Sequence, residues 1–178
     1  MSPDDTPSAT PVLRTTRAEI RPLAESDFPA LDAIVREPSV ASWWPMAPGA
    51  SIRDDLFAEG TVPFAIEVDG VVAGTVTHEE EATLSYRHAR VDIMLGTAYQ
   101  DLGLGTEVLR AVVRYLIGER GHHRVTIDPA VANVRAIRAY EKVGFKPVGV
   151  MRRYERASDG TWHDNLLMDL LAEEFVDG

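Results

Sequence analysis

The segment Gln100–Thr106, with the sequence QDLGLGT, constrains the fold of this chain more than any other. It joins a predicted strand, Ala89–Leu95, to a predicted helix that begins at Gly105. Glycines at alternate positions let several backbone N–H groups point to one side, at the positive end of the helix dipole. The segment therefore favours an anion site, most naturally for a pyrophosphate, with a purely structural turn as the alternative. The helical periodicity is carried by Val108, Leu109, Val112, Val113, Leu116 and Ile117.

Two familiar phosphate-binding loops are excluded by single residues. The nucleoside-triphosphate loop requires Gly-Lys-Ser/Thr, but Thr106 follows Gly105 directly, with no lysine between them. The dinucleotide fingerprint requires a third glycine, and Val108 occupies its position. A different kind of phosphate site is therefore expected.

The remaining pattern predicts residues 17–178 as one α/β domain with a mixed sheet, after a flexible tail at residues 1–16. Asp69-Gly70 suits a type I′ hairpin turn, and an acidic stretch, His78–Ala82, follows the hairpin. The predicted strands are Ala18–Leu23, Phe64–Val68, Val71–Thr77, Ala89–Leu95, Arg124–Ile127, Lys146–Arg153 and Trp162–Leu171. The other predicted helices are one capped by Ser26 or Asp27 and ending before Pro38, then Val40–Trp44, Ile52–Glu59 with a Ser51/Asp54 capping box, and Asn133–Val143.

Composition excludes several classes of function. The chain has no cysteine, which rules out disulfides, thiolate catalysis and cysteine-ligated metals, and its five histidines lack metal-binding spacing. The net charge of -10 argues against nucleic acid or an anionic membrane as a partner and favours a cationic ligand, with solubility as the simpler explanation. No stretch is long and apolar enough for a membrane span, and the polar N-terminus has no secretion signal, so we expect a cytoplasmic protein.

Two sequence blocks together resemble the GNAT acetyltransferase superfamily. Gln100–Gly105 matches its Q/R-x-x-G-x-G/A signature, and Asn133–Phe145, NVRAIRAYEKVGF, is similar to its N-x-x-A-I-x-x-Y-E-x-x-G-F block. The resemblance implies a mostly antiparallel sheet with helices on both faces. It also implies a V-shaped gap between the fourth and fifth strands, here Ala89–Leu95 and Arg124–Ile127, that takes the pantetheine arm of coenzyme A.

Within the superfamily, the chain is most similar to the aminoglycoside 6′-N-acetyltransferases. The similarity is carried by Trp43-Trp44, Gly103–Thr106, Thr126–Pro129 and Arg135–Phe145. The resemblance implies an acetyl-CoA-dependent enzyme that acetylates a small cationic amine, an aminoglycoside in an antibiotic-resistance role, without a metal and commonly as a homodimer. The last stretch, from Trp162, is more like acetyltransferases of protein N-termini or acyltransferases of lysine-type amines. A longer acyl donor and a non-enzymatic coenzyme A-binding regulator are further alternatives.

The resemblance also implies roles for individual residues. Asp92 is expected to act as a base or to bind the acceptor, and Tyr140 to protonate the leaving thiolate. A solvated Asp92, a packing role for Tyr140 and a plain helix N-cap at Asn133 are the alternatives. A backbone N–H near Ile93–Leu95, at a strand bulge found in the superfamily, is expected to polarise the thioester. The expected coenzyme-binding residues are Ile93, Met94, Leu95, Gln100, Asp101, Leu102, Gly103, Leu104, Gly105, Thr106, Asn133, Ala136 and Tyr140.

The acceptor is expected to bind on the acidic side of the domain. Residues 1–90 carry 15 acidic and 7 basic residues, a net charge of -8, and residues 91–178 carry 13 and 11, a net charge of -2. The first half is expected to form much of the acceptor side, so most of the charge lies where a cationic amine would approach. The alternatives are core packing for the tryptophans, a solvated surface for the acids on strands and a turn role before Pro129 for the acid at position 128. The expected acceptor-binding residues are Trp43, Trp44, Glu79, Asp92, Asp128 and Asp164.

Overall fold

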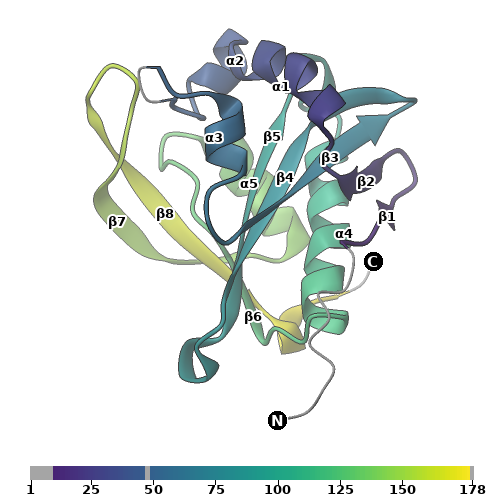
Figure 1. Cartoon of the computed structure of the whole chain (residues 1–178). Coiled ribbons are helices and arrows are strands. Elements are labelled where there is room, and N and C mark those ends of the chain that lie inside the picture. The colour runs from purple at the N-terminus through teal and green to yellow at the C-terminus, as the bar shows by residue number, and fades with distance from the viewer. Residues whose placement is uncertain (1–9, 47–48, 177–178) are drawn as a thin grey trace.

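An eight-stranded sheet runs through the computed structural model, which describes residues 10–46 and 49–176. Its strand order is β1-β2-β3-β4-β5-β6-β8-β7 (Figure 1), and every neighbouring pair is antiparallel except β5 and β6. This mixed, mostly antiparallel sheet confirms the predicted fold class. The strands are β1 (Leu13–Arg14), β2 (Glu19–Pro22), β3 (Thr61–Val68), β4 (Val71–Glu81), β5 (His88–Leu95), β6 (Arg124–Ile127), β7 (Lys146–Arg156) and β8 (Trp162–Leu171).

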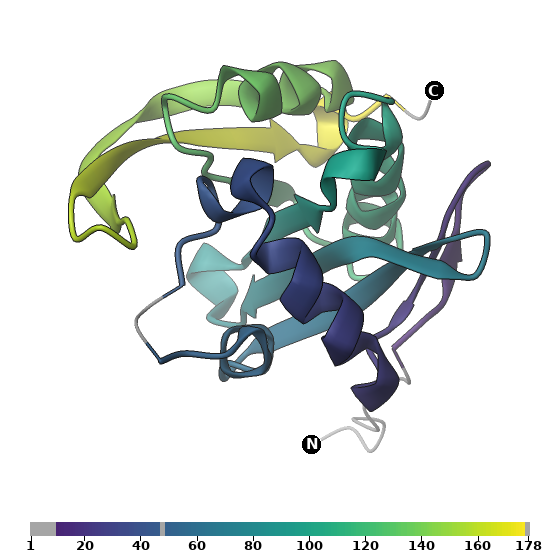
Figure 2. The same cartoon turned by 90° about the horizontal axis from the view of Figure 1, so that it is seen from above.

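Helices cover both faces of the sheet, as predicted. The three short helices α1–α3 lie on one face (Figure 2). They enclose a hydrophobic cluster with Val72 and Met94 of the sheet. On the other face, α4 and α5 pack over the larger cluster. The helices are α1 (Phe28–Val35), α2 (Pro38–Ala41), α3 (Ile52–Leu56), α4 (Leu104–Gly118) and α5 (Val134–Val143), and 3₁₀ turns cover Glu25–Asp27, Leu84–Tyr86, Thr97–Tyr99 and Ala172–Glu174.

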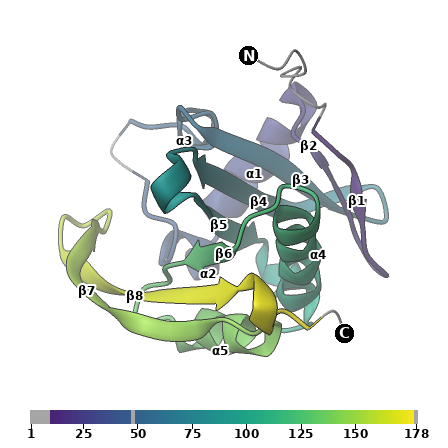
Figure 3. The ribbon, with the colours of Figure 1, turned by 90° about the horizontal axis from the view of Figure 1, so that it is seen from below.

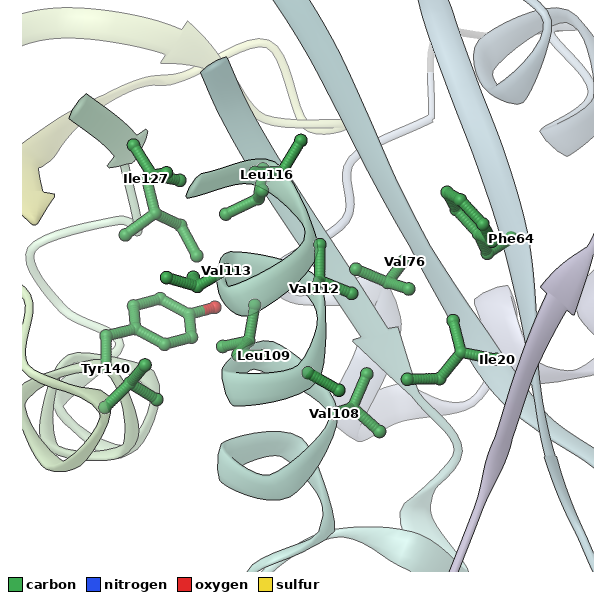
Figure 4. Close-up of a cluster of buried hydrophobic side chains, with 14 of the residues drawn as sticks. Ile20, Phe64, Val76, Val108, Leu109, Val112, Val113, Leu116, Ile127 and Tyr140 are labelled. Carbon is green, nitrogen blue, oxygen red and sulfur yellow. The ribbon is translucent and has the colours of Figure 1, made fainter. Parts of the chain in front are cut away.

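The apolar face of α4 is the centre of the larger cluster (Figure 4). Val112 lies toward Val76 of the sheet and Val108 toward Ile20 of β2, while Val113 lies toward Tyr140 of α5. The labelled α4 side chains in this cluster are all buried. Because the helix contacts both halves of the sheet, it fixes where its own N-terminus lies relative to β5.

The sheet opens between β5 and β6. These two parallel strands pair only at Ala89↔Val125 and Arg90↔Thr126, so residues 91–95 of β5 have no partner on that side. Beyond β6, strands β7 and β8 splay away from β3–β5 together with α5 (Figure 3). The predicted gap therefore lies where the sequence resemblance placed it, between Ala89–Leu95 and Arg124–Ile127.

Strand β4 is longer than the sequence predicts. The acidic stretch, expected to leave the hairpin after Thr77, continues the strand to Glu81 and pairs with β5, for example Glu79 opposite Arg90. Side chains in this part of the strand alternate between the two faces, with His78 buried and Glu79 exposed. Because both residues are polar, the alternation does not appear as an apolar periodicity in the sequence. The hairpin turn itself is as predicted, with positive φ at both Asp69 and Gly70.

Several other boundaries differ from those predicted. Strand β7 continues past Arg153 to Arg156 because it stays paired with β8 beyond a register shift. Helix α3 ends at Leu56, three residues early, and α2 lies at Pro38–Ala41, with proline in its first turn. The 1–16 tail prediction falls partly on residues 1–9, outside the described residues. Its later part is ordered, since Leu13 and Arg14 pair with β2.

Candidate active site

A cleft of about 890 Å³ occupies the gap between β5 and β6. Its lining includes the Gly-rich segment and α5, and also residues of β5 and β7 and the segment Asp128–Ala130 that follows β6. Asp92 and Tyr140 both line this cleft, so the two expected catalytic residues face one space. Expected coenzyme-binding residues that line it are Ile93, Met94, Leu95, Gln100, Asp101, Gly103, Gly105, Thr106, Asn133, Ala136 and Tyr140.

The Gly-rich segment turns sharply into α4. Asp101 and Gly103 both have left-handed backbone conformations, with φ of 58° and 77°, and Gly103 is the N-cap of the helix. This geometry brings Gly103, Gly105 and Thr106 to the cleft at the N-terminus of a 15-residue helix. Two expected ligands are elsewhere: Leu102 is 61% exposed outside the cleft and Leu104 is buried in the core. The turn is thus suited to bind an anion through its backbone.

Arg17 fixes the outer side of this turn. Its Nε donates to Glu107 Oε2 at 2.7 Å, and its Nη1 donates to the carbonyl oxygen of Leu102 at 2.8 Å. Its backbone N–H also donates to Glu107 Oε1 at 2.9 Å. The first turn of α4 is therefore tied to the N-terminal part of the domain.

Cations of α5 line the same cleft. Arg135, Arg138 and Lys142 are separated by three and four positions, so they share one helical face. Arg135 Nη1 donates to Gln100 Oε1 at 2.7 Å, and Gln100 Nε2 donates to the Leu95 carbonyl at 2.8 Å. The sequence prediction missed these cations, although their spacing within the second block is a signal that could have found them.

Asn133 has the geometry of a helix N-cap, the simpler of its two interpretations. Its side chain accepts the N–H of Ala136 at 3.2 Å, which is an N-cap bond for α5. The same residue also lines the cleft. Capping and facing the cleft are therefore compatible in this structure.

Asp92 lies on β5 at the open part of the gap, partly buried, with Oδ1 accepting the Ile93 N–H at 2.8 Å. Burial raises its pKa to about 7, against the opposing effects of Arg90 and of this backbone hydrogen bond. Asp128 and Glu155 raise the pKa further by charge repulsion. A carboxyl group with this pKa changes protonation near neutral pH, as a general base requires.

The strand bulge implied by the resemblance is absent from the β4–β5 ladder. The pairing runs without a register shift from Gly74↔Leu95 to Glu81↔His88. The register shift in this part of the sheet lies instead between β3 and β4, at Ile66/Glu67. The unbroken register shows that the prediction of a bulge was wrong for this strand. Of the backbone N–H groups near Ile93–Leu95, that of Ile93 donates to the Asp92 side chain.

Tyr140 is both a core residue and a cleft residue. It is 7% exposed, its ring packs edge-on against Phe145 at 6.4 Å between centroids, and it still lines the cleft. Burial is the main cause that raises its pKa, and the charge of Asp92 adds to it. The phenol therefore stays protonated over the physiological range and is available as a proton donor.

Asp128 and Arg90 form an ion pair in the lining of the cleft. Arg90 Nε lies 3.3 Å from Asp128 Oδ2, and Arg90 Nη1 lies 3.6 Å from Glu79 Oε2. Burial raises the pKa of Asp128, and Arg90 opposes that rise. Glu79 borders a smaller adjoining cavity of about 150 Å³ rather than the main cleft. The sequence prediction included both carboxylates but missed the arginine between them.

Strand β7 contributes two residues that the sequence prediction also missed. Tyr154 and Glu155 line the cleft. Burial raises the pKa of Tyr154, and the charge of Asp128 adds to the rise. Burial raises the pKa of Glu155, and the neighbouring Asn165 opposes that rise. A register shift between Met151 and Glu155 precedes them. No local sequence signal marks that shift.

Of the other residues expected to bind the acceptor, two line the cleft and one does not. Trp43 and Trp44 line the cleft, and Trp44 Nε1 donates to Asp55 Oδ2 at 2.9 Å. Asp164 is exposed outside the cleft, where Oδ1 accepts the N–H of Arg153 at 2.7 Å.

Over residues 10–46 and 49–176, no group of three His, Cys, Asp or Glu side chains is arranged to hold a metal ion. In the same residues, no helix is both long and apolar enough to cross a membrane.

Comparison with known proteins gives the chain a family. Residues 17–146 match the family model described as acetyltransferase (GNAT) domain. An aminoglycoside N(6′)-acetyltransferase type 1 of Klebsiella pneumoniae is 32% identical over 135 residues, 75% of this chain and 61% of that relative. An N-alpha-acetyltransferase of Sulfurisphaera tokodaii is 33% identical over 100 residues, 51% of this chain and 60% of that relative. The chain thus spans about three fifths of these relatives' lengths.

Solved structures share the fold. A putative acetyltransferase from T. thermophilus has a TM-score of 0.82 at 24% identity, covering 94% of this chain and 93% of its own. AAC(6′)-Ib in complex with ribostamycin and coenzyme A has a TM-score of 0.73 at 22% identity, covering 89% of this chain and 95% of its own. The two sequence blocks, the divided sheet and the matched family model lead to one conclusion. The chain belongs to the GNAT acetyltransferase family.

Proposed function

We propose that this protein transfers an acetyl group from acetyl-CoA to a primary amine of a small cationic acceptor, such as the 6′-amine of an aminoglycoside. The observation that carries the proposal is the charge division of one continuous cleft. Backbone N–H groups, Arg135, Arg138 and Lys142 lie at the Gly-rich segment. Asp92, Asp128 and Glu155 line the same cleft, where Arg90 pairs with Asp128. A phosphate-bearing donor suits the first set of residues and an ammonium group the second.

Direct transfer fits the two expected catalytic residues of this cleft. Asp92 accepts a proton from the acceptor ammonium, and the amine nitrogen then forms a bond to the thioester carbonyl carbon. The carbon–sulfur bond breaks, and the Tyr140 hydroxyl donates a proton to the departing thiolate. The amine nitrogen loses its second proton as the amide forms, and this proton restores the Tyr140 hydroxyl. Because the sequence contains no cysteine, the acetyl group cannot pass through an acetyl-cysteine intermediate.

An amine panel with acetyl-CoA, measured by release of free thiol, tests the proposal. The panel contains kanamycin, ribostamycin, a simple diamine and a peptide with a free N-terminal alanine. We expect thiol release with the aminoglycosides and a mass increase of one acetyl group on the acceptor. Thiol release with none of the amines would contradict the enzymatic proposal and favour a coenzyme A-binding regulator.

A second candidate is acetylation of a protein N-terminus. The similarity to the Sulfurisphaera tokodaii N-alpha-acetyltransferase favours it, over 51% of the chain. The peptide arm of the panel distinguishes the two candidates. Turnover of the peptide without turnover of any aminoglycoside would replace the first candidate by the second.

A further inference from the structure

Arg90 holds an unusual position in the cleft. It extends from β5 between Glu79 of β4 and Asp128, which directly follows β6, so one guanidinium is shared by two carboxylates. These are carboxylates expected to bind the acceptor, and Asp92 lies two residues further along β5. Arg90 also lines the main cleft, with its side chain 38% exposed. It is therefore a protein cation at the acceptor end.

The Arg90 contacts are looser than those of the structural arginines in this fold. Arg21 bonds Asp27 at 2.8 Å, and Arg124 bonds Asp169 at 2.8 Å. Arg90 approaches Asp128 only to 3.3–3.4 Å. Its Nε is buried and has no hydrogen-bond partner of good geometry among the described residues. Since charge-assisted bonds normally close to about 2.7–2.9 Å, the Arg90 pair is not at its optimum.

There is also room for the guanidinium to move. The smaller cavity of about 150 Å³ borders Arg90 on the side of β3, β4 and α3. Arg90, Trp44 and Asp92 line both cavities, so these three side chains lie between the small cavity and the cleft. The Arg90 side chain can shift toward Glu79 without a change in the β5 backbone.

We propose that Arg90 is a specificity-determining residue whose guanidinium competes with the acceptor's ammonium group for Asp128 and is displaced toward Glu79 when the acceptor binds. The inference rests on the proposed function, since it assumes a cationic acceptor at this end of the cleft. Arg90 keeps the buried carboxylate of Asp128 paired when no acceptor is present, which avoids the cost of an isolated buried charge. In exchange, it weakens acceptor binding and favours acceptors that carry a strong positive charge.

The test compares wild type with Arg90→Gln. For kanamycin at low salt, we expect the KM to fall about tenfold, with the KM for acetyl-CoA changed less than twofold. Calorimetric binding of kanamycin to the coenzyme A-saturated protein should tighten by the same factor. Because competition is electrostatic, the difference should shrink as salt rises.

Arg124→Gln is the matched control, because it breaks an arginine–aspartate pair on the neighbouring strand outside the cleft lining. It should leave the KM for kanamycin unchanged. If Arg90→Gln does not fold, Arg90→Lys replaces it, since a lysine point charge cannot span both carboxylates. We then expect a KM about threefold below that of wild type.

A KM or dissociation constant that stays the same or rises in the Arg90 variants would overturn the inference, because Arg90 would then be positioning Asp128 for the acceptor. The proposed function fails differently, by absence of thiol release from the wild-type protein. The calorimetric comparison does not depend on turnover, so the two failures are distinguishable. Kanamycin binding that is undetectable in both wild type and Arg90→Gln would also count against the inference.

Discussion

Asp92 shows how one residue acquires chemistry from its surroundings. An aspartate in water has a pKa near 3.8, whereas burial on β5 raises the pKa of Asp92 to about 7. The raised value means that the carboxylate is costly to form in the folded protein and therefore a good proton acceptor. Position in the gap, rather than residue type, makes Asp92 suited to be a base.

Replacing Asp92 by asparagine should remove this base. We expect Asp92→Asn to lower kcat at pH 8 by a factor of about 10²–10⁴, with the KM for acetyl-CoA changed little. In wild type, kcat should rise with pH to a plateau, with a midpoint near the pKa of about 7, and the variant should lack this limb. Steady-state rates from about pH 5.5 to about pH 9 measure both effects. A variant that keeps its rate would remove Asp92 from the mechanism.

At the scale of elements, the sequence predicts the helices, strands and turns that depend on nearby residues. It does not predict those that depend on pairing with residues far away in the sequence. Helices α4 and α5, strand β6 and the β3–β4 turn carry local signals, namely periodicity, caps and an Asp-Gly pair, and they lie within about one residue of prediction. The end of β4 and the last part of β7 depend on pairing with strands distant in sequence. No local pattern reports that pairing.

The same division applies to the site. The Gly-rich segment and the α5 block were identified because their residues are contiguous. Arg90, Tyr154 and Glu155 reach the cleft through cross-strand register and a register shift, so they were missed. Asp164 was included because of its neighbours in sequence, yet it lies outside the cleft lining.

Gly74 provides a test of how β4 and β5 fit together. A Cβ at this position would lie 2.0 Å from the Met94 carbonyl oxygen, a backbone atom of the cleft strand. Gly74→Ala must therefore push β5 away from β4, and we expect a loss of about 3 kcal/mol in the free energy of unfolding. Chemical denaturation measures it.

Gly118→Ala is the matched control for this substitution. Gly118 ends α4, its added Cβ would meet nothing within 4 Å, and its φ is not positive. We expect this variant to be unchanged or more stable by up to about 1 kcal/mol, because alanine restricts the unfolded chain. Equal effects at the two glycines would show that the close approach of β4 to β5 is unimportant.

At the scale of the whole molecule, function and stability make opposite demands on pH. Burial raises the pKa values of Asp92, Asp128 and Glu155, so the folded state holds protons that the unfolded chain has lost above about pH 4. Stability therefore decreases as pH rises from about 4 through the folded pKa values, which for Asp92 is about 7. The expected activity is therefore highest at the pH values at which ionisation of these carboxyl groups lowers the stability of the folded protein.

Two buried histidines set the limit on the acid side. Burial lowers the pKa values of His78 and His122, although Glu80 opposes the effect in both. Arg120 lowers both further, and the two histidines lie close enough for His122 to disfavour charge on His78. The folded state thus holds fewer protons here than the unfolded chain, and this stability is lost as pH falls below about 6.5.

These signs predict that Tm falls from about pH 6.5 to about pH 8 while kcat rises over the same range. The change from 3.8 to about 7 in the pKa of Asp92 corresponds to a loss of at most about 4 kcal/mol once the group is fully ionised. Asp92→Asn should therefore be more stable than wild type at about pH 8 and less different at about pH 5. Thermal unfolding across the pH series measures both proteins. A Tm that rises with pH in wild type would contradict the sign.

The irregular shape of strand β7 also affects the tendency of this chain to aggregate. As the last strand of the sheet, β7 leaves one edge unpaired over 11 residues, with Val148 and Val150 exposed. Such an edge is a template for intermolecular β-pairing and aggregation. The register shifts, a left-handed Arg153 and the neighbouring Arg152 and Arg156 interrupt it with bends and positive charge. The distortion that brings Tyr154 and Glu155 to the cleft therefore also makes the edge a poor seed for fibrils.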